Sequence, residues 1–447
     1  MTSVILNSNE NSAIISTIVA SDSKEVPSIY STKKIYAPSA TSWFSLNASN
    51  GSRTNGQSEN WQLPKFGVLT QILFNYEKTL PLQPSAVAPT GGTIPFVGMG
   101  VFKADVFDVI DRVEFLSSSR VISTLYSEDL RSQFSNLSQD QINPMIATAL
   151  QGEDASTGQT VNQPLTKLQF TIPLCFGMFR DINTCPNLQF NENCAIRVVY
   201  NNVERMELGL SGNGTLGTVV PPTISSSRLH LRYKQYSESD TAELLAENYS
   251  AETLNQLTSR FYRENPVVPP TNRKDNTASV ELRNIDAVKA FYISVKKIPE
   301  ARAESDPATN VARAVNNVAN EYRFIKSVKL TSSGQVICEL DAQQLRYSKF
   351  TENGWSFSQL QASSEFPSIS NVVKIQTGLW ENAGGGAMSN AWSLREMNNC
   401  VIEVEWETSA GVASSQTEPV IVNVEEECLT ILSTSSNTGR VVNSLSN

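Results

Sequence analysis

The chain has few of the groups that carry enzyme chemistry or hold nucleic acid. Its 447 residues include one histidine, and charged residues make up 18% of the sequence. The net charge is −9, and the lysines and arginines form no basic block. Affinity for nucleic acid comes from clustered basic side chains that neutralise phosphates. The composition therefore argues against a direct, sequence-specific nucleic-acid partner.

A secretory signal and a long hydrophobic run are missing from the N-terminus. Residues 1–20 lack the positive start and the long apolar segment of a signal peptide. The apolar run at 13–20 is far shorter than the roughly 20 residues that span a bilayer. We therefore expect a protein made inside the cell without export. The run is compatible with an ordinary first strand, a strand added to a neighbouring molecule, or an arm near a membrane surface.

The cysteines show neither Cys-x-x-Cys spacing nor accompanying histidines, so the spacing of a zinc site is absent. Three of them, Cys194, Cys338 and Cys400, lie on the apolar side of alternating segments, where they are predicted to be buried small hydrophobic residues. A reducing site of folding fits this usage. We expect no metal and no cofactor.

The single histidine offers little to a catalytic mechanism. Alternation places His230 on a polar strand face with Arg232 and Lys234. A Ser-His-Asp or Cys-His site would need this histidine, yet no Gly-x-Ser-x-Gly or other nucleophile motif occurs. We predict no catalytic residues and a protein that is not an enzyme.

Carboxylates occur in two groups, Glu403 with Glu405 and a run at 425–427. The first two lie two residues apart on one side of a predicted strand. A solvated strand face is the favoured interpretation, and the acid and base pair of a glycoside-cleaving enzyme is the alternative.

A repeated motif dominates what the chain does contain. The pattern Asn-Cys-x-Ile-x-Val-x-aromatic occurs at 193–200 and again at 399–406. In both copies the Cys, Ile, Val and aromatic residues lie on one face of an extended strand, which predicts a half-buried strand. A strand that recurs at the spacing of one domain indicates two similar β-domains, although a β-rich chain also produces such an echo by chance. The length allows two large cores.

Many short alternating runs separated by turn residues predict antiparallel sandwiches or jelly rolls in both halves. The predicted strands are 68–76, 106–116, 167–172, 194–200, 228–236, 278–282, 287–296, 323–331, 335–341, 372–377, 400–406 and 426–432. Helical spacing at 128–151 and 306–322 predicts insertions in loops. A further helix start at 239–247 lies in a predicted linker over 237–276.

Several segments resemble the double jelly-roll major capsid proteins of icosahedral DNA viruses, a lineage of large eukaryotic DNA viruses, virophages and membrane-containing phages. The second-half match runs through Thr-Gly-Leu-Trp-Glu-Asn at 377–382 and continues over 386–399. The first half is similar over 168–176, with its Ile-Pro-Leu-aromatic turn, and over 188–191. The strand at 229–236 and the helix after it resemble the family's closing strand and linker. The family's usual proline in the small-residue turn and its basic linker cluster are absent, which leaves the viral subgroup open.

The resemblance implies an all-β fold of two tandem eight-stranded jelly rolls with short helical insertions in loops and linker. It divides the chain into five parts: an N-terminal arm (1–31), a first roll (32–236), a linker with a short helix (237–276), a second roll (277–432) and a C-terminal tail (433–447).

The resemblance also implies a function, partners and a location. The chain would form pseudo-hexameric homotrimers that tile an icosahedral shell, after synthesis and assembly inside the host cell. Its partners would be itself, neighbouring capsomers, penton and minor capsid proteins, and an internal membrane reached through the N-terminal arm.

The alternative function is a receptor- or carbohydrate-binding tandem β-sandwich, such as a penton, fibre or lectin-like attachment protein. Aromatic side chains that stack on sugars would carry it. The candidates for such a platform are Trp43, Trp61, Trp355, Trp380 and Trp392.

Overall fold

The computed structural model describes most of both predicted rolls. The described residues are 39–53, 56–81, 107, 109–135, 165–179, 185–188, 193–201, 223–236, 253–269, 276–284, 287–297, 322–345, 347, 372–376, 392–394, 397, 399–407, 420–435 and 441–443. The predicted arm at 1–31, the predicted helix at 239–247 and all but the last residue of the predicted helix at 306–322 lie outside them. That last residue, Tyr322, forms an isolated β-bridge with Lys296 and is not helical.

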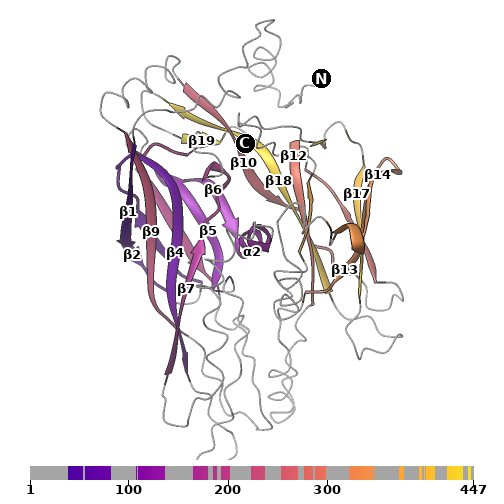
Figure 1. Ribbon diagram of the computed structural model, residues 1–447, viewed down its shortest axis with the longest axis horizontal. Coiled ribbons are helices and arrows are strands. Elements are labelled where there is room, and N and C mark those ends of the chain that lie inside the picture. The colour runs from indigo at the N-terminus through magenta and orange to yellow at the C-terminus, as the bar shows by residue number, and fades with distance from the viewer. Residues whose placement is uncertain are drawn as a thin grey trace, which may run out of the picture.

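The first half folds into two antiparallel sheets that face each other (Figure 1). One sheet has the order β1-β9-β4-β7, from strands β1 (Ser39–Asn47), β9 (Thr223–Tyr236), β4 (Val68–Pro81) and β7 (Leu165–Pro173). The other has the order β2-β3-β8-β5-β6, from strands β2 (Asn50–Gly51), β3 (Ser58–Gln62), β8 (Cys194–Tyr200), β5 (Ile110–Ser117) and β6 (Arg120–Tyr126). The helix α2 (Ser127–Ser135) follows β6 directly, and a single 3-10 turn, η2 (Gly177–Phe179), follows β7.

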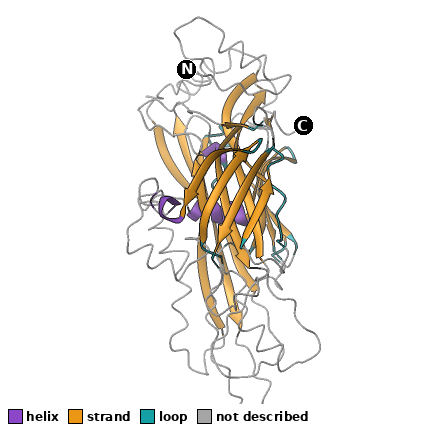
Figure 2. Cartoon of the chain, turned by 90° about the vertical axis from the view of Figure 1, so that its right-hand side faces the viewer, coloured by secondary structure: helices purple, strands orange, loops and turns teal. Residues whose placement is uncertain are grey.

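The second half repeats this arrangement. One sheet has the order β10-β18-β12-β15, from strands β10 (Thr253–Arg263), β18 (Val420–Ser435), β12 (Ala287–Lys297) and β15 (Val373–Gln376). Two short strands join it, β16 (Trp392–Ser393) on β12 and β19 (Val441–Asn443) on β18. The facing sheet has the order β11-β17-β13-β14, from strands β11 (Thr277–Glu281), β17 (Cys400–Trp406), β13 (Ile325–Ser332) and β14 (Gln335–Asp341). Figure 2, seen from the side of the second roll, shows the strands running steeply along the molecule.

The strand orders of the two halves match position by position. Strands β1, β9, β4 and β7 correspond to β10, β18, β12 and β15, and strands β3, β8, β5 and β6 correspond to β11, β17, β13 and β14. Each set of eight is a jelly roll, a double-sheet fold that leaves few free edges. The predicted all-β double jelly roll is confirmed.

The repeated motif occupies equivalent strands, β8 and β17. Cys194 and Cys400 are buried at the start of these strands, and Ile196 and Ile402 have no exposed surface. The sequence echo therefore reflects two copies of one structural position.

The hairpins next to the motif strands are alike as well. Positive φ angles occur at Ser118 and Ser119 between β5 and β6, and at Ser333 and Gly334 between β13 and β14. Two central residues with positive φ match the right-handed twist of a two-residue hairpin. Each hairpin also carries a register shift near its turn, between Phe115 and Leu116 in one roll and between Leu330 and Thr331 in the other.

Each roll has its own hydrophobic core between its sheets. Trp61, Phe74 and Tyr233 lie in the first core, and Phe291, Ile402 and Val422 lie in the second. The period of two along each strand directs these side chains inward. Burial of apolar surface on this scale is the main force that holds each roll together.

The predictions missed strands β1, β2, β3 and β6 within the first roll, and the other differences lie mainly at the domain boundaries. Residues 253–263, predicted as linker, form β10 and pair with β18 along their whole length. The last strand extends to Ser435, and β19 lies within the predicted tail, so part of 433–447 belongs to the sheet. Part of the first predicted helical insertion is confirmed as α2, and 136–151 lies outside the described residues. No helix among the described residues is long and apolar enough to cross a membrane.

Candidate functional site: the polar seam between the two rolls

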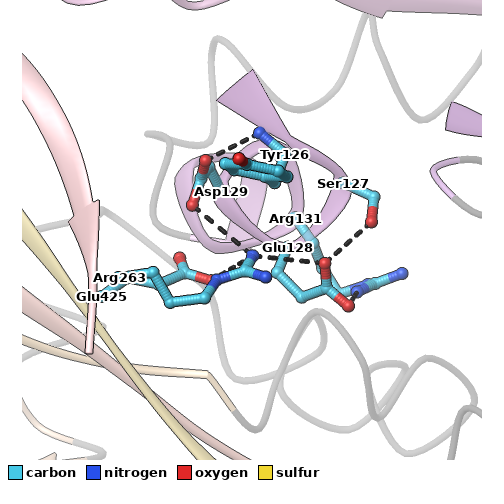
Figure 3. A network of polar contacts seen from close by, with 7 residues as sticks. All are labelled: Tyr126, Ser127, Glu128, Asp129, Arg131, Arg263 and Glu425. Carbon is cyan, nitrogen blue, oxygen red and sulfur yellow. Dashed lines mark hydrogen bonds and ion pairs between the residues drawn. The ribbon is translucent and has the colours of Figure 1, made fainter. Parts of the chain in front are cut away.

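Charged side chains from both rolls meet beside α2, which lies between the two rolls (Figures 1 and 3). We call Glu128, Asp129, Arg131, Arg263 and Glu425 the seam cluster. Glu128, Asp129 and Arg131 come from α2 in the first roll, whereas Arg263 and Glu425 come from β10 and β18 in the second.

The start of α2 is held by its own acidic residues. The Asp129 Oδ2 atom accepts a hydrogen bond of 2.7 Å from the backbone N–H of Tyr126, and the Ser127 hydroxyl donates one of 2.8 Å to Glu128. Acidic side chains in the first turn also interact favourably with the positive end of the helix dipole. Sequence and local structure therefore place two carboxylates at the helix end that faces the second roll.

Arg263 joins three carboxylates at once. Its Nη2 atom lies 3.3 Å from Glu128 Oε2, 3.4 Å from Glu425 Oε1 and 3.8 Å from Asp129 Oδ1. The guanidinium also stands 5.0 Å from the centre of the Tyr126 ring, which is cation–π geometry. One arginine of the second roll thus contacts α2, the end of β6 and its own neighbouring strand.

Burial raises the pKa values of these carboxyl groups, whereas the neighbouring cations lower them. Burial raises the pKa of Glu425 to about 8, and the adjacent Asp129 adds to the effect. Burial also raises the pKa of Asp129, to about 6, against the opposing attraction of Arg263. Burial acts against ionisation of Glu128 too, but Arg131, Arg263 and Lys296 outweigh it and lower that pKa to about 2. Asp129 and Glu425 therefore hold a proton between them near neutral pH.

Other cations complete the charge balance around α2. Arg131 is buried, and its Nη1 atom lies 3.8 Å from Glu128 Oε1. Its guanidinium stands 5.5 Å from the centre of the Tyr322 ring and 5.9 Å from that of Phe107. Lys296 of β12 stands 5.9 Å from the same Tyr322 ring. Removing one partner would leave a buried charge uncompensated. That is far more destabilising than replacing the whole ion pair by hydrophobic residues.

A backbone contact also joins the rolls beside the charges. A side chain at Gly177, in the first roll, would overlap the carbonyl oxygen and hydroxyl of Ser259 on β10. Phe261, two residues further along β10, packs against the core of the first roll. The outward face of β10 is therefore buried by the other roll.

The acidic run at 425–427 is buried, with at most 1% of each residue exposed. The Tyr292 hydroxyl donates a 3.1 Å hydrogen bond to Glu427, and the Asn284 side chain donates one of 2.5 Å to Glu426. Sequence reasoning recorded the run but did not recognise it as buried. The available signal was three acids inside an otherwise apolar strand.

The predicted polar positions lie where alternation placed them. His230 lies on the outer face of β9, with its Nδ1 atom 2.8 Å from the Ser45 hydroxyl, while Leu229 and Leu231 are fully buried. Glu403 and Glu405 lie on the outer face of β17, 3.6 Å from Lys329 and 3.7 Å from Lys326. The expected solvated strand face is thus observed for this pair.

The cysteines follow the prediction with one exception. None of the six, all of which lie in the described residues, forms a disulfide, and Cys194 and Cys400 are buried as expected. Cys338 is half-buried because it lies on β14, the outermost strand of its sheet. Among the described residues, no group of three or more His, Cys, Asp or Glu side chains could hold a metal ion.

The structure does not join the tryptophans of the alternative function. Trp61 is fully buried in the first core, and Trp392 packs against the second core. Trp43 is 53% exposed on β1. Trp355 and Trp380 lie outside the described residues. Trp61 and Trp392 therefore contribute to no common sugar-stacking surface.

Known structures share this fold although their sequences differ. The PBCV-1 virus capsid protein matches with a TM-score of 0.59 at 12% identity, over 92% of this chain and 98% of the other. The Sputnik virophage structure matches at 0.53 with 10% identity, over 91% and 88%. The mavirus major capsid protein matches at 0.51 with 11% identity, over 90% of both chains. No family model matches the sequence, and no curated protein is similar to it. The chain thus has the double jelly-roll fold of viral major capsid proteins.

Proposed function

We propose that this chain is a structural major capsid protein, and that its homotrimers tile an icosahedral virus shell. The observation that carries the proposal is the pair of matched rolls locked side by side by a buried seam. Two similar rolls make a two-lobed unit, and three such units approximate a hexagon. The fold shared with capsid proteins of PBCV-1, Sputnik and mavirus supports this role.

The seam supports the proposal because a tiling unit needs a fixed angle between its rolls. Interfaces between domains of one chain generally allow relative motion unless they are large and well packed. Here the backbone approach at Gly177 and the seam cluster hold the two rolls in one arrangement. A rigid unit presents the same lateral surfaces in every copy, as repeated contacts in a shell require.

The proposal places the chain in the virion, after synthesis and assembly inside the host cell. Its partners are other copies of itself, neighbouring capsomers, and penton and minor capsid proteins. The segment at 1–31 would tie capsomers together or reach an internal membrane. The role is structural, without catalysis, cofactor or direct contact with specific nucleic-acid sequences.

The mass of the purified protein in solution tests the proposal. Light scattering on a sizing column should show a heat-resistant species of about three times the 49.1 kDa chain. Electron microscopy of concentrated samples should then show shells or hexagonal arrays. A stable monomer would contradict the capsomer and favour an attachment module, which a glycan-binding screen would detect.

Deletion of residues 1–20 tests the role of the arm separately. We expect the deletion variant to form trimers as the full chain does, but to assemble poorly into shells. Normal particles from this variant would show that the arm does not join capsomers.

A further inference from the structure

Two equivalent strands, β6 and β14, differ sharply in how they are covered. Each is the outermost strand of its sheet, and each follows the same kind of hairpin. Ile122 of β6 is 7% exposed, whereas Ile337 of β14 is 37% exposed. Apart from two half-buried residues, every position of β14 is exposed. The fold is the same at both places, so the difference lies in what packs against the strand.

The second roll of the same chain covers β6. Strands β10 and β19 lie against it, and α2 follows its last residue, Tyr126. Arg263 of β10 stacks over Tyr126 and binds the acids at the start of α2. Strand β6 is thus covered by the outward face of β10, the first strand of the second roll, and Arg263 lies at the centre of that contact.

The end of β14 offers an equivalent surface without that cover. The strand ends at Asp341, in the place of Tyr126, and a helical turn begins at 342–345. The Asp341 Oδ1 atom accepts 2.8 Å hydrogen bonds from the backbone N–H groups of Gln343 and Gln344, which fixes the turn. Tyr347, just beyond, is 68% exposed. Among the described strands, β14 pairs with β13 alone.

The matching half of this contact lies on the first roll, where no described strand covers it. Strand β1 occupies the place of β10, at the edge of its sheet. Trp43 lies on its outward face and is 53% exposed. The Arg232 guanidinium of the neighbouring strand β9 stands 5.8 Å from the centre of the Trp43 ring. An aromatic residue and an arginine thus lie together here, as Phe261 and Arg263 do on β10.

We propose that the β14 edge of one copy docks on the β1–β9 face of the next copy. The inference rests on the proposed function and names the surfaces through which copies join. Ile337 and Tyr347 would pack against Trp43, and Asp341 would pair with Arg232. In Figure 1 the two surfaces lie at opposite ends of the molecule, so a chain cannot satisfy its own free edge.

A second copy is the occupant because the chain itself carries both halves of the contact. The seam shows that the β6 type of edge and the β10 type of face fit each other in this sequence. The β14 edge and the β1–β9 face form an equivalent pair of surfaces, in which Asp341 takes the place of Tyr126. A contact between different surfaces of identical copies runs head to tail and closes into a ring when the rotation allows. Covering an exposed outer strand also removes a site for unwanted pairing.

Trp43→Ser and Ile337→Asp test the two surfaces one at a time. Each should weaken association about 30-fold or more per contact and give monomers at micromolar concentration, because central aromatic and apolar contacts dominate interfaces. Val268→Asp is the matched control, since Val268 is 56% exposed and follows Val267, which pairs with Val422 of the second roll. It should leave the oligomer unchanged. Circular dichroism and thermal melting should show that all three variants are folded.

Mixing the two variants gives the decisive result. The Trp43→Ser chain keeps an intact β14 edge, and the Ile337→Asp chain keeps an intact β1 face, so a mixture should form a two-chain species through one intact contact. Trimers formed by both single variants would overturn the inference and leave the proposed function standing. A mixture that stays monomeric would also overturn it. A wild-type monomer would instead overturn the proposed function.

Discussion

The two jelly rolls have the same strand order, the same hairpin and the same motif strand, yet their outer faces are chemically different. On β8 and β5 of the first roll, Arg197 pairs with Glu114. On the equivalent β17 and β13 of the second, the acid and base are exchanged, and Glu403 pairs with Lys329. The inward positions of both motif strands remain Cys, Ile and Val. The comparison shows that the core pattern defines the roll, whereas its surroundings determine the outer face.

A second difference lies in the aromatic residue that ends the motif. The Tyr200 hydroxyl donates a 2.5 Å hydrogen bond to Glu59, a carboxylate that is 3% exposed. Ser227 and Arg53 contact the same carboxylate. The second roll has Trp406 at this place, buried against its core. The first roll therefore holds a polar cluster where the second relies on apolar contacts.

Removal of the seam arginine should have the largest effect on how the rolls are held together. Arg263→Ala leaves Asp129 and Glu425 buried without their cation, and breaking such a pair costs about 3–5 kcal/mol. Chemical denaturation should show this loss in the free energy of unfolding. Arg283→Ala, which changes an exposed arginine just after β11, is the control and should change stability by no more than about 0.5 kcal/mol. A loss below about 1 kcal/mol for Arg263→Ala would show that the seam does not join the rolls.

Shortening the equivalent isoleucines tests whether the two cores are packed alike. Ile196→Ala and Ile402→Ala each remove a fully buried side chain, which should cost about 2–5 kcal/mol of unfolding free energy. Similar losses would confirm that the motif strand contributes equally to the stability of both rolls. A much smaller loss in one roll would show that its core collapses around the cavity.

Adding a side chain where the backbones of the two rolls lie close together should lower stability by an intermediate amount. Gly177→Ala forces its new methyl group against Ser259, and such overpacking costs about 1–3 kcal/mol. Gly334→Asn is the matched control, because that glycine has open space and asparagine tolerates its positive φ. Equal stability of the Gly177→Ala variant and the wild type would mean that the rolls separate without cost.

The seam carboxylates should make the stability of the protein depend on pH. Burial raises the pKa of Glu425 and of Asp129 in the folded protein, so folding takes up protons between pH 3.8 and about 8. The contribution of this pair is therefore present at low pH and is lost as the pH rises through that window. Glu128 acts in the opposite sense, because its lowered pKa makes its contribution disappear as the pH falls from 4.5 towards 2.

Glu425→Gln should remove most of the loss of stability that the Asp129–Glu425 pair causes as the pH rises, since the neutral amide has no proton to lose. Its stability relative to the wild type should rise steadily from pH 5 to pH 8 in denaturation experiments. Asp129→Asn should have the same effect if the two carboxyls share a proton. Parallel pH profiles for wild type and both variants would contradict the shared proton.

Much of the fold follows from local pattern. The strands at 194–200, 335–341 and 400–406 were predicted with the bounds that the structure has, because the alternation along them is regular. Strand β10 was missed for a physical reason. Its outward face is buried by the first roll as well, and it carries Thr258 and Ser259 as buried residues, so no apolar alternation marks it.

The site was much less predictable than the strands. Arg263 and Glu128 lie far apart in the sequence, and neither belongs to a motif. The burial of the run at 425–427 was not predicted, because acids are seldom fully buried without partners. Only the approach of β10 and α2 supplies those partners.

The sequence alone predicted the fold class and most strands of the two rolls, because period-two alternation and turn residues act within a few residues of each other. Tertiary structure decided which edge is covered and which carboxylates keep a proton. Both depend on groups brought together from distant segments, whose mutual burial and charge no local pattern records.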